Sequence, residues 1–199
     1  MSVRLVCATA LVVIGTTLRA QGAPTILPPD QQIAGAVLAA PKDMRASAEV
    51  LGYSPEGKLV TLRKGTGSLI CLISDPKAED FQSACYHKSL EPFMARGRAL
   101  RAQGIKGDEV DTVRFREVKQ GKLHMPKSPA VLYTLNGKTA NFDAASGTLK
   151  DARPLFVVYI PFATGESLGL SAQPVVGAPW VMYPGTPKAH IMFVPKMGP

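Results

Sequence analysis

Histidine and glutamate are the side chains of this sequence best suited to acid–base chemistry. The chain holds three histidines, His87, His124 and His190. Because an imidazole titrates near neutral pH, we take His87 and His190, together with Glu91, as acid–base candidates. Three imidazoles could also bind a catalytic zinc ion, but no two of these lie four residues apart on a helix. One hypothesis is therefore a small enzyme whose active residues are dispersed along the chain.

A serine in the pattern G-x-S-x-G suggests a nucleophile, since Gly165–Gly169 reads Gly-Glu-Ser-Leu-Gly after an apolar segment. In hydrolases of that type, the acid and then the histidine follow the serine. Here no Asp or Glu occurs after Glu166, and residues 170–178 contain a proline and a glycine that disfavour the required helix. We therefore predict a loop at this position.

Two cysteines, Cys71 and Cys85, remain once Cys7 is assigned to an export signal. An even number of cysteines in an exported chain predicts a disulfide bond. This bond would close a loop of 15 residues, which is worth about 3 kcal/mol in the chain-entropy model. The alternative is a metal or haem carrier that uses Cys85, His87 or His190, although the spacing matches neither a haem attachment motif nor a C-x-x-C zinc motif. We predict no cofactor and no metal site.

Residues 1–20 have the layout of a secretory signal peptide. Arg4 precedes an apolar run from Leu5 to Gly15, and small residues lead to Ala20 and Gly22, where cleavage would fit. The run is too short for a stable membrane anchor, and no other apolar run is long enough to span a bilayer. We expect the mature protein to be periplasmic or secreted, with no transmembrane anchor.

Net charge and the C-terminal aromatic residues indicate the partners that an exported protein of this kind could bind. Without Arg4 and Arg19, 21 basic residues face 15 acidic ones, a net charge of +6. This excess favours an anionic envelope surface or polysaccharide, and we find no specific nucleic-acid motif. The basic residues that could form an anion-binding patch are Arg96, Arg98 and Arg101. Trp180 and Tyr183, with Met182, Met192 and Phe193, form either core or an apolar binding groove.

The elements that must position these residues follow from periodicity and turn chemistry. Strands are predicted at Ala48–Tyr53, Leu59–Arg63 and Leu69–Ile73, joined as an antiparallel meander. A helix begins at Asp75 and Pro76, carries Cys85 and ends near Leu90. A second helix spans Pro92–Gln103. Residues Asp108–Gly121 also suit a helix through Val110, Val113 and Val118, although Val113–Arg116 alternates like a strand, and we predict the helix.

Strands return in the last third. Val131–Leu135 and Lys138–Phe142 flank Asn136-Gly137, which is typical of a tight hairpin. The apolar run Leu155–Phe162 predicts a further strand, and Trp180–Tyr183 and His190–Val194 predict a final hairpin. The order of strands, helices and strands indicates the α+β class, an antiparallel sheet with two or three helices inserted between N-terminal and C-terminal strands. We divide the chain into a signal peptide (1–20), a Pro- and Ala-rich lead-in with a short helix from Asp30 (21–41), and a single domain (42–199).

Three short strings resemble a group of uncharacterised exported bacterial proteins. They are Pro41–Ala46, Leu62–Thr66 before Cys71, and the surroundings of Cys85. The resemblance implies export from a bacterium and carries no activity. We therefore expect an envelope protein that acts as a binding or interaction module. The alternatives are the enzyme and the metal or haem carrier described above.

Overall fold

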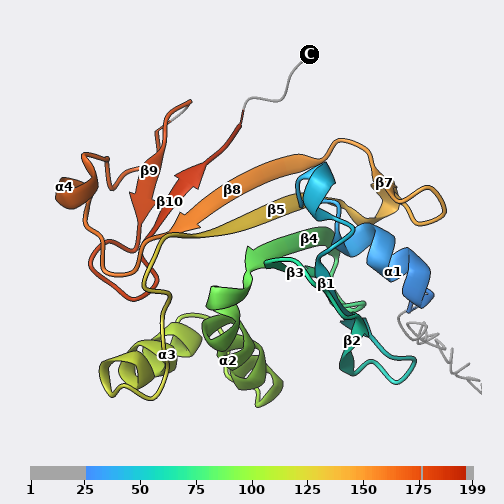
Figure 1. Cartoon of the computed structure of the whole chain (residues 1–199), viewed down its shortest axis with the longest axis horizontal. Helices are drawn as coiled ribbons and strands as arrows, with labels where there is room; N and C mark the ends of the chain where they lie inside the picture. The colour runs from blue at the N-terminus through green and yellow to red at the C-terminus, as the bar shows by residue number, and fades with distance from the viewer. Residues whose placement is uncertain (1–25, 176, 196–199) are drawn as a thin grey trace, which may run out of the picture.

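An eight-stranded sheet carries the fold, with strand order β2-β1-β3-β4-β5-β8-β10-β9 (Figure 1). The computed structural model describes residues 26–175 and 177–195, so the predicted signal peptide lies outside the described residues. The strands are β1 (Glu49–Tyr53), β2 (Leu59–Arg63), β3 (Leu69–Ile73), β4 (Asp80–His87), β5 (Ala130–Lys138), β8 (Arg153–Tyr159), β9 (Trp180–Met182) and β10 (His190–Phe193). A separate ribbon pairs β6 (Phe142–Asp143) with β7 (Thr148–Leu149).

Four α-helices and three short 3₁₀ turns complete the part of the chain that the structure describes. The helices are α1 (Pro29–Ala36), α2 (Glu91–Ala102), α3 (Glu109–Lys119) and α4 (Gly165–Leu168), and the turns are η1 (Lys42–Met44), η2 (Lys88–Leu90) and η3 (Thr139–Asn141). Helices α2 and α3 lie between the N-terminal and C-terminal strands, so the predicted α+β class is confirmed, as are the helices predicted at 92–103 and 108–121. Within the described residues, no helix is long and apolar enough to cross a membrane.

Alternate residues of the strands form two separate cores on the two faces of the sheet. On one face, Cys71, Ile73 and Phe81 pack with Ala36 of α1. On the other face, Ile70, Tyr86 and Val157 pack with Phe93 of α2 and with residues of α3. Because successive side chains of a strand leave opposite faces, this alternation decides which helix each strand residue contacts.

The predicted antiparallel meander of the first three strands is wrong, because β1 lies between β2 and β3. β1 pairs antiparallel with β2 and parallel with β3, so the link 64–68 passes across the chain that enters β1. A Cβ atom on Gly65 would overlap the backbone nitrogen of Glu49, and one on Gly67 would lie 2.5 Å from the Ser47 hydroxyl oxygen. The two glycines therefore permit a backbone crossing rather than a reversal.

The helix predicted from Asp75 to Leu90 is also wrong. The Asp75 carboxylate accepts a hydrogen bond from the backbone nitrogen of Lys77 at 2.8 Å, which closes a turn, and the chain continues as β4. Phe81, Ser83 and Cys85 alternate into one core, as a strand requires. The predicted Cys71–Cys85 disulfide is confirmed, but it joins two neighbouring strands instead of a strand and a helix.

The predicted hairpin at Asn136-Gly137 is replaced by a single long strand. β5 runs through both residues to Lys138, because β4 pairs with it continuously from Asp80 to Tyr86. Asn136 accepts a hydrogen bond from the Gln82 side chain at 2.8 Å. Gly137 leaves room for Leu149 of β7, whose methyl carbons would lie 3.1 Å from an added Cβ atom.

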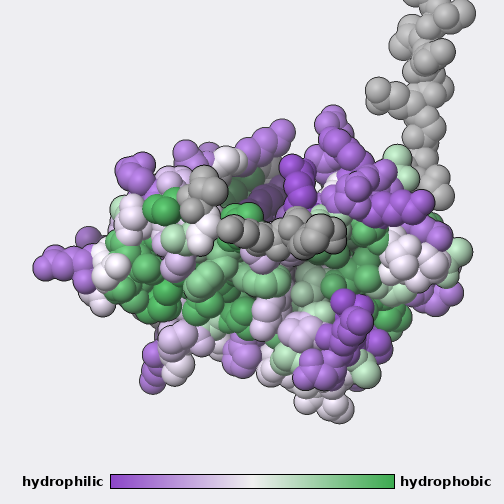
Figure 2. Space-filling model, turned by 90° about the horizontal axis from the view of Figure 1, so that it is seen from above, coloured by the Kyte–Doolittle hydropathy of each residue, from purple (hydrophilic) through white to green (hydrophobic). Residues whose placement is uncertain are grey.

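The C-terminal hairpin of β9 and β10 forms as predicted, and β10 also pairs with β8. Tyr133, Phe156 and Phe193 are direct partners across β5, β8 and β10, so they make one aromatic row. This row lies on the face away from α2 and α3, and Phe156 and Phe193 are exposed. Figure 2 looks down on this side and shows hydrophobic residues gathered there.

Candidate functional site

A cleft of about 690 Å³ opens between the C-terminal half of α2 and the part of the sheet that α2 leaves uncovered. Leu72 of β3 and its partner Ala84 of β4 line its apolar surface. Tyr53, at the end of β1, and Lys58, in the turn before β2, line the side opposite α2. The volume falls in the usual range of small-ligand sites.

Helix α2 turns two of the three predicted arginines toward this cleft and the third away from it. Arg98 and Arg101 are three residues apart, so they share one side of the helix and both line the cleft. Arg96 instead binds Glu117 of α3 with two hydrogen bonds, of 2.8 and 2.6 Å. The predicted arginine patch is therefore divided between the cleft and the contact of α2 with α3.

Arg98 is held in place by two partners, the buried Tyr86 and the partly exposed Glu91. Its guanidinium donates to the Tyr86 hydroxyl at 2.9 Å and to the Glu91 carboxylate at 2.6 Å, and Tyr86 donates to the same carboxylate at 2.5 Å. Burial alone would lower the pKa of Arg98, but the charges and hydrogen bonds of Tyr86 and Glu91 raise it overall. Burial, followed by the hydrogen bond to Glu91, raises the pKa of Tyr86. Arg98 is therefore a fixed cation, and Glu91 holds it in position.

Two further cations face the cleft from opposite sides. Arg101 on α2 and Lys58 on the β1–β2 turn are exposed, and neither forms an ion pair within residues 26–175 and 177–195. Asp75 is the carboxylate among the lining residues. Glu91 balances the charge of Arg98, so Lys58 and Arg101 face the single carboxylate of Asp75, and this small excess of positive charge favours an anionic ligand.

Trp180, Tyr183 and His190 come together at the C-terminal hairpin. The His190 ring lies 5.0 Å from the ring of Tyr159 and 5.7 Å from that of Tyr183. Its Nδ1 donates to the Lys188 carbonyl at 2.6 Å. Burial lowers the pKa of His190, so the folded protein holds a neutral imidazole at pH 7.

A buried ion-pair network ties this hairpin to α3. The Asp111 carboxylate accepts from Lys188 at 2.7 Å and also from Arg114. Arg114 donates to the Phe93 carbonyl at 3.1 Å, and its guanidinium carbon lies 3.8 Å from the centre of the Phe93 ring. Arg114 Nε and Trp180 Nε1 are buried without an acceptor in the described part of the chain. Sequence reasoning missed Asp111, Arg114 and Lys188, since only the fold brings the hairpin onto α3.

The acid–base candidates do not converge. His87 follows Tyr86 on β4 and so leaves the face opposite to the one that holds His190. The Nδ1 of His87 accepts from the Ser89 backbone at 3.2 Å, and Glu91 is committed to Tyr86 and Arg98. His124 is exposed in the loop after α3.

Two other sequence motifs have structural roles. Ser167, of the G-x-S-x-G pattern, accepts from the Thr164 nitrogen at 2.9 Å and so caps the single turn of α4, which forms where a loop is predicted. Cys85 is bonded to Cys71 and holds no free thiol. Among residues 26–175 and 177–195, no three His, Cys, Asp or Glu side chains are grouped as they would be around a metal ion.

Sequence reasoning found Arg98 and Arg101 but missed the residues opposite them. Lys58 lies in a turn, where a lysine is unremarkable, and Tyr86 was assigned to a helix that does not form. The chain matches no protein-family model, no curated protein and no solved structure, so the cleft itself carries the argument for function.

Proposed function

We propose that this protein is an exported bacterial envelope protein that binds an acidic polysaccharide in the cleft beside α2. The observation that carries the proposal is the set of three cations, Lys58, Arg98 and Arg101, around an apolar floor. The confirmed disulfide supports an oxidising compartment, where such bonds persist. The net positive charge of the chain would draw an anionic partner toward it.

The chemistry of the cleft fits a sugar acid. A guanidinium presents donors in a planar fork that matches a carboxylate, and Arg101, which has no ion pair within the described residues, can offer this fork, while Tyr86 and Glu91 hold Arg98 in place beside it. Such preorganisation lowers the entropy lost on binding. Leu72 and Ala84 offer an apolar surface to the C–H groups of a sugar ring, and Asp75 can accept a hydrogen bond from a hydroxyl.

Calorimetric titration with a uronic acid oligosaccharide tests the proposal. We expect binding that weakens as salt is added, since exposed charges are screened. Arg101→Ala should weaken binding about tenfold or more, because a hydrogen bond to a charged group contributes about 1.5–3 kcal/mol. Lys58→Ala should weaken it by a smaller factor, since Lys58 is a flexible point charge.

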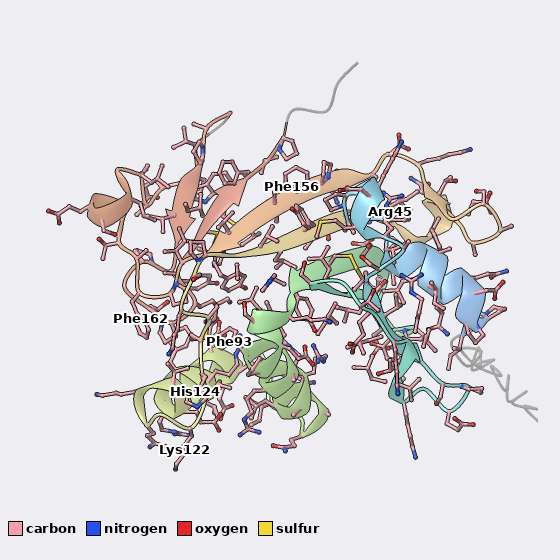
Figure 3. The ribbon with its side chains drawn as sticks, in the orientation of Figure 1. Arg45, Phe93, Lys122, His124, Phe156 and Phe162 are labelled. Atoms are coloured by element: carbon pink, nitrogen blue, oxygen red, sulfur yellow. A yellow bond between two sulfur atoms is a disulfide. The ribbon has the colours of Figure 1, made fainter. Side chains whose placement is uncertain are left out.

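Lys122→Ala is the matched control. Lys122 is exposed beyond the end of α3, outside the residues that line the cleft (Figure 3), and its loss changes the net charge equally. If Lys122→Ala weakens binding as much as Arg101→Ala, attraction is general to the surface and the cleft is not the site. Binding only to vesicles of anionic lipid would also overturn the polysaccharide assignment.

A further inference from the structure

A second pocket, of about 530 Å³, lies between the end of α3, the loop 121–129 and the end of β8. Most of its lining is apolar, and the apolar lining residues include Val118, Leu123, Met125, Ile160 and Phe162. It shares no lining residue with the cleft beside α2. Any ligand in this pocket is therefore independent of the polysaccharide proposed above.

Phe162 at the rim combines two unfavourable features. Its φ angle is 66°, a left-handed conformation that is strained for a residue with a Cβ atom. Its side chain is also 55% exposed. The conformation is held by hydrogen bonds from the Phe162 nitrogen to the Thr186 carbonyl at 2.9 Å and from Ala163 to Ile160 at 3.0 Å. Strained residues that persist in this way cluster at binding sites.

The charge at this rim has one sign. The ionisable residues that line the pocket are His124 and Lys127, both exposed, and the described lining includes no carboxylate. An apolar cavity with a basic rim complements a ligand that has an apolar body and an anionic head.

We propose that this pocket binds a free fatty acid, with the alkyl chain against Phe162 and Leu123 and the carboxylate near Lys127. When the alkyl chain enters the pocket, it covers the exposed Phe162 ring. The strained backbone conformation therefore holds this ring where the ligand can contact it. The pocket is open enough to admit the alkyl chain of the ligand from solvent, since Phe162 and the 126–129 segment form its exposed border.

Calorimetry with dodecanoate below its micelle concentration tests the proposal. We expect the affinity to rise by up to about fourfold per methylene from octanoate to dodecanoate, because each buried methylene contributes about 0.8 kcal/mol. Dodecyltrimethylammonium, with the same chain and the opposite charge, should bind at least tenfold more weakly. Lys127→Gln should reduce the difference in affinity between dodecanoate and dodecyltrimethylammonium.

Phe162→Gly separates binding from folding. Glycine adopts a left-handed φ without strain, which offsets the greater entropy of its unfolded chain, so this variant should remain folded with an unfolding temperature close to that of the wild type, yet bind dodecanoate at least tenfold more weakly. Phe156→Ser is the control, since Phe156 is also an exposed phenylalanine but lies on the open sheet face, outside this pocket (Figure 3).

Three results would overturn the assignment. They are equal binding of the cationic amphiphile, an equal loss of affinity in Phe156→Ser, and sedimentation with anionic vesicles without binding of monomeric dodecanoate. Arg101→Ala should leave dodecanoate binding unchanged, so failure of this proposal is distinguishable from failure of the polysaccharide proposal.

Discussion

Replacing Asp111 with alanine should destabilise the protein far more than replacing an exposed aspartate. Asp111 is the carboxylate between Arg114 and Lys188, and its side chain is only 16% exposed. Without it, the buried Arg114 guanidinium keeps the Phe93 carbonyl as its hydrogen-bond acceptor, and Lys188 loses its ion pair. Removing one partner of a buried ion pair costs about 3–5 kcal/mol, because a charge is left without compensation.

Asp80→Ala supplies the comparison. Asp80 pairs with Lys138 at 2.9 Å, but the two side chains are 57% and 73% exposed, so the pair contributes about 0–1 kcal/mol. For a chain of this length, the expected loss at Asp111 lowers the unfolding midpoint by about 6–20 °C, whereas the loss at Asp80 lowers it by a few degrees at most. Asp111→Asn retains hydrogen-bonding atoms, so its loss of stability should lie between those of Asp111→Ala and Asp80→Ala.

Equilibrium unfolding in guanidinium chloride measures all three variants. Trp180 is the one tryptophan of the chain and is buried in β9, a strand of the hairpin that the network ties to α3, so its fluorescence reports on this hairpin. Burial alone would raise the pKa of Asp111, but hydrogen bonds from Lys188 and Arg114 lower it overall. The stability that Asp111 contributes should therefore be present at neutral pH and be lost as the pH falls through the lowered pKa. If Asp111→Ala loses no more stability than Asp80→Ala, the network is not the tie between the hairpin and α3.

Further outcomes follow from the disulfide, the strand crossing and the buried histidine. Replacing Cys71 and Cys85 together with alanine should lower the free energy of unfolding by about 3 kcal/mol in a denaturant titration, and a change under 1 kcal/mol would contradict the loop-closure reasoning. Gly65→Ala should cost about 2–3 kcal/mol or prevent folding, since the added methyl overlaps the Glu49 backbone, and wild-type stability would mean that the chains do not cross there. Because burial lowers the pKa of His190, the unfolded chain takes up a proton first, so stability should fall as the pH drops below about 6.5. His190→Gln should reduce this dependence between pH 7 and 5, and an unchanged slope would show that His190 is not its source.

Local sequence patterns predicted helices and strands well where the buried residues recur at the regular spacing of a helix or a strand. Helices α2 and α3 were identified because apolar and charged residues alternate at helical spacing and a glycine follows each helix. The strand β4 was missed because Ser83, a small polar residue, occupies a core position. Its hydroxyl donates to the Ala36 carbonyl at 2.7 Å and accepts from the Ala39 nitrogen at 3.0 Å, both at the end of α1. Only tertiary contact makes Ser83 a core residue, so no local pattern could show it.

Strand order was the least predictable part of the fold. A sequence of three short strands with glycine-rich links favours neighbours in chain order, yet β3 passes to the far side of β1. The same limit applies to the cleft. Arg98 and Arg101 could be paired from helical spacing, whereas Lys58 meets them only because the β1–β2 turn is carried to the same end of the sheet.

The position of the disulfide has a mechanical consequence. It crosses the border between β3 and β4, with β2, β1 and β3 on one side and the other five strands on the other. Under tension the remaining borders can unzip one hydrogen bond at a time, but this border opens only if a covalent bond breaks. Leu72 and Ala84, the floor of the cleft, lie on its two sides. A load that peels away β9 and β10 would therefore leave the floor of the cleft intact.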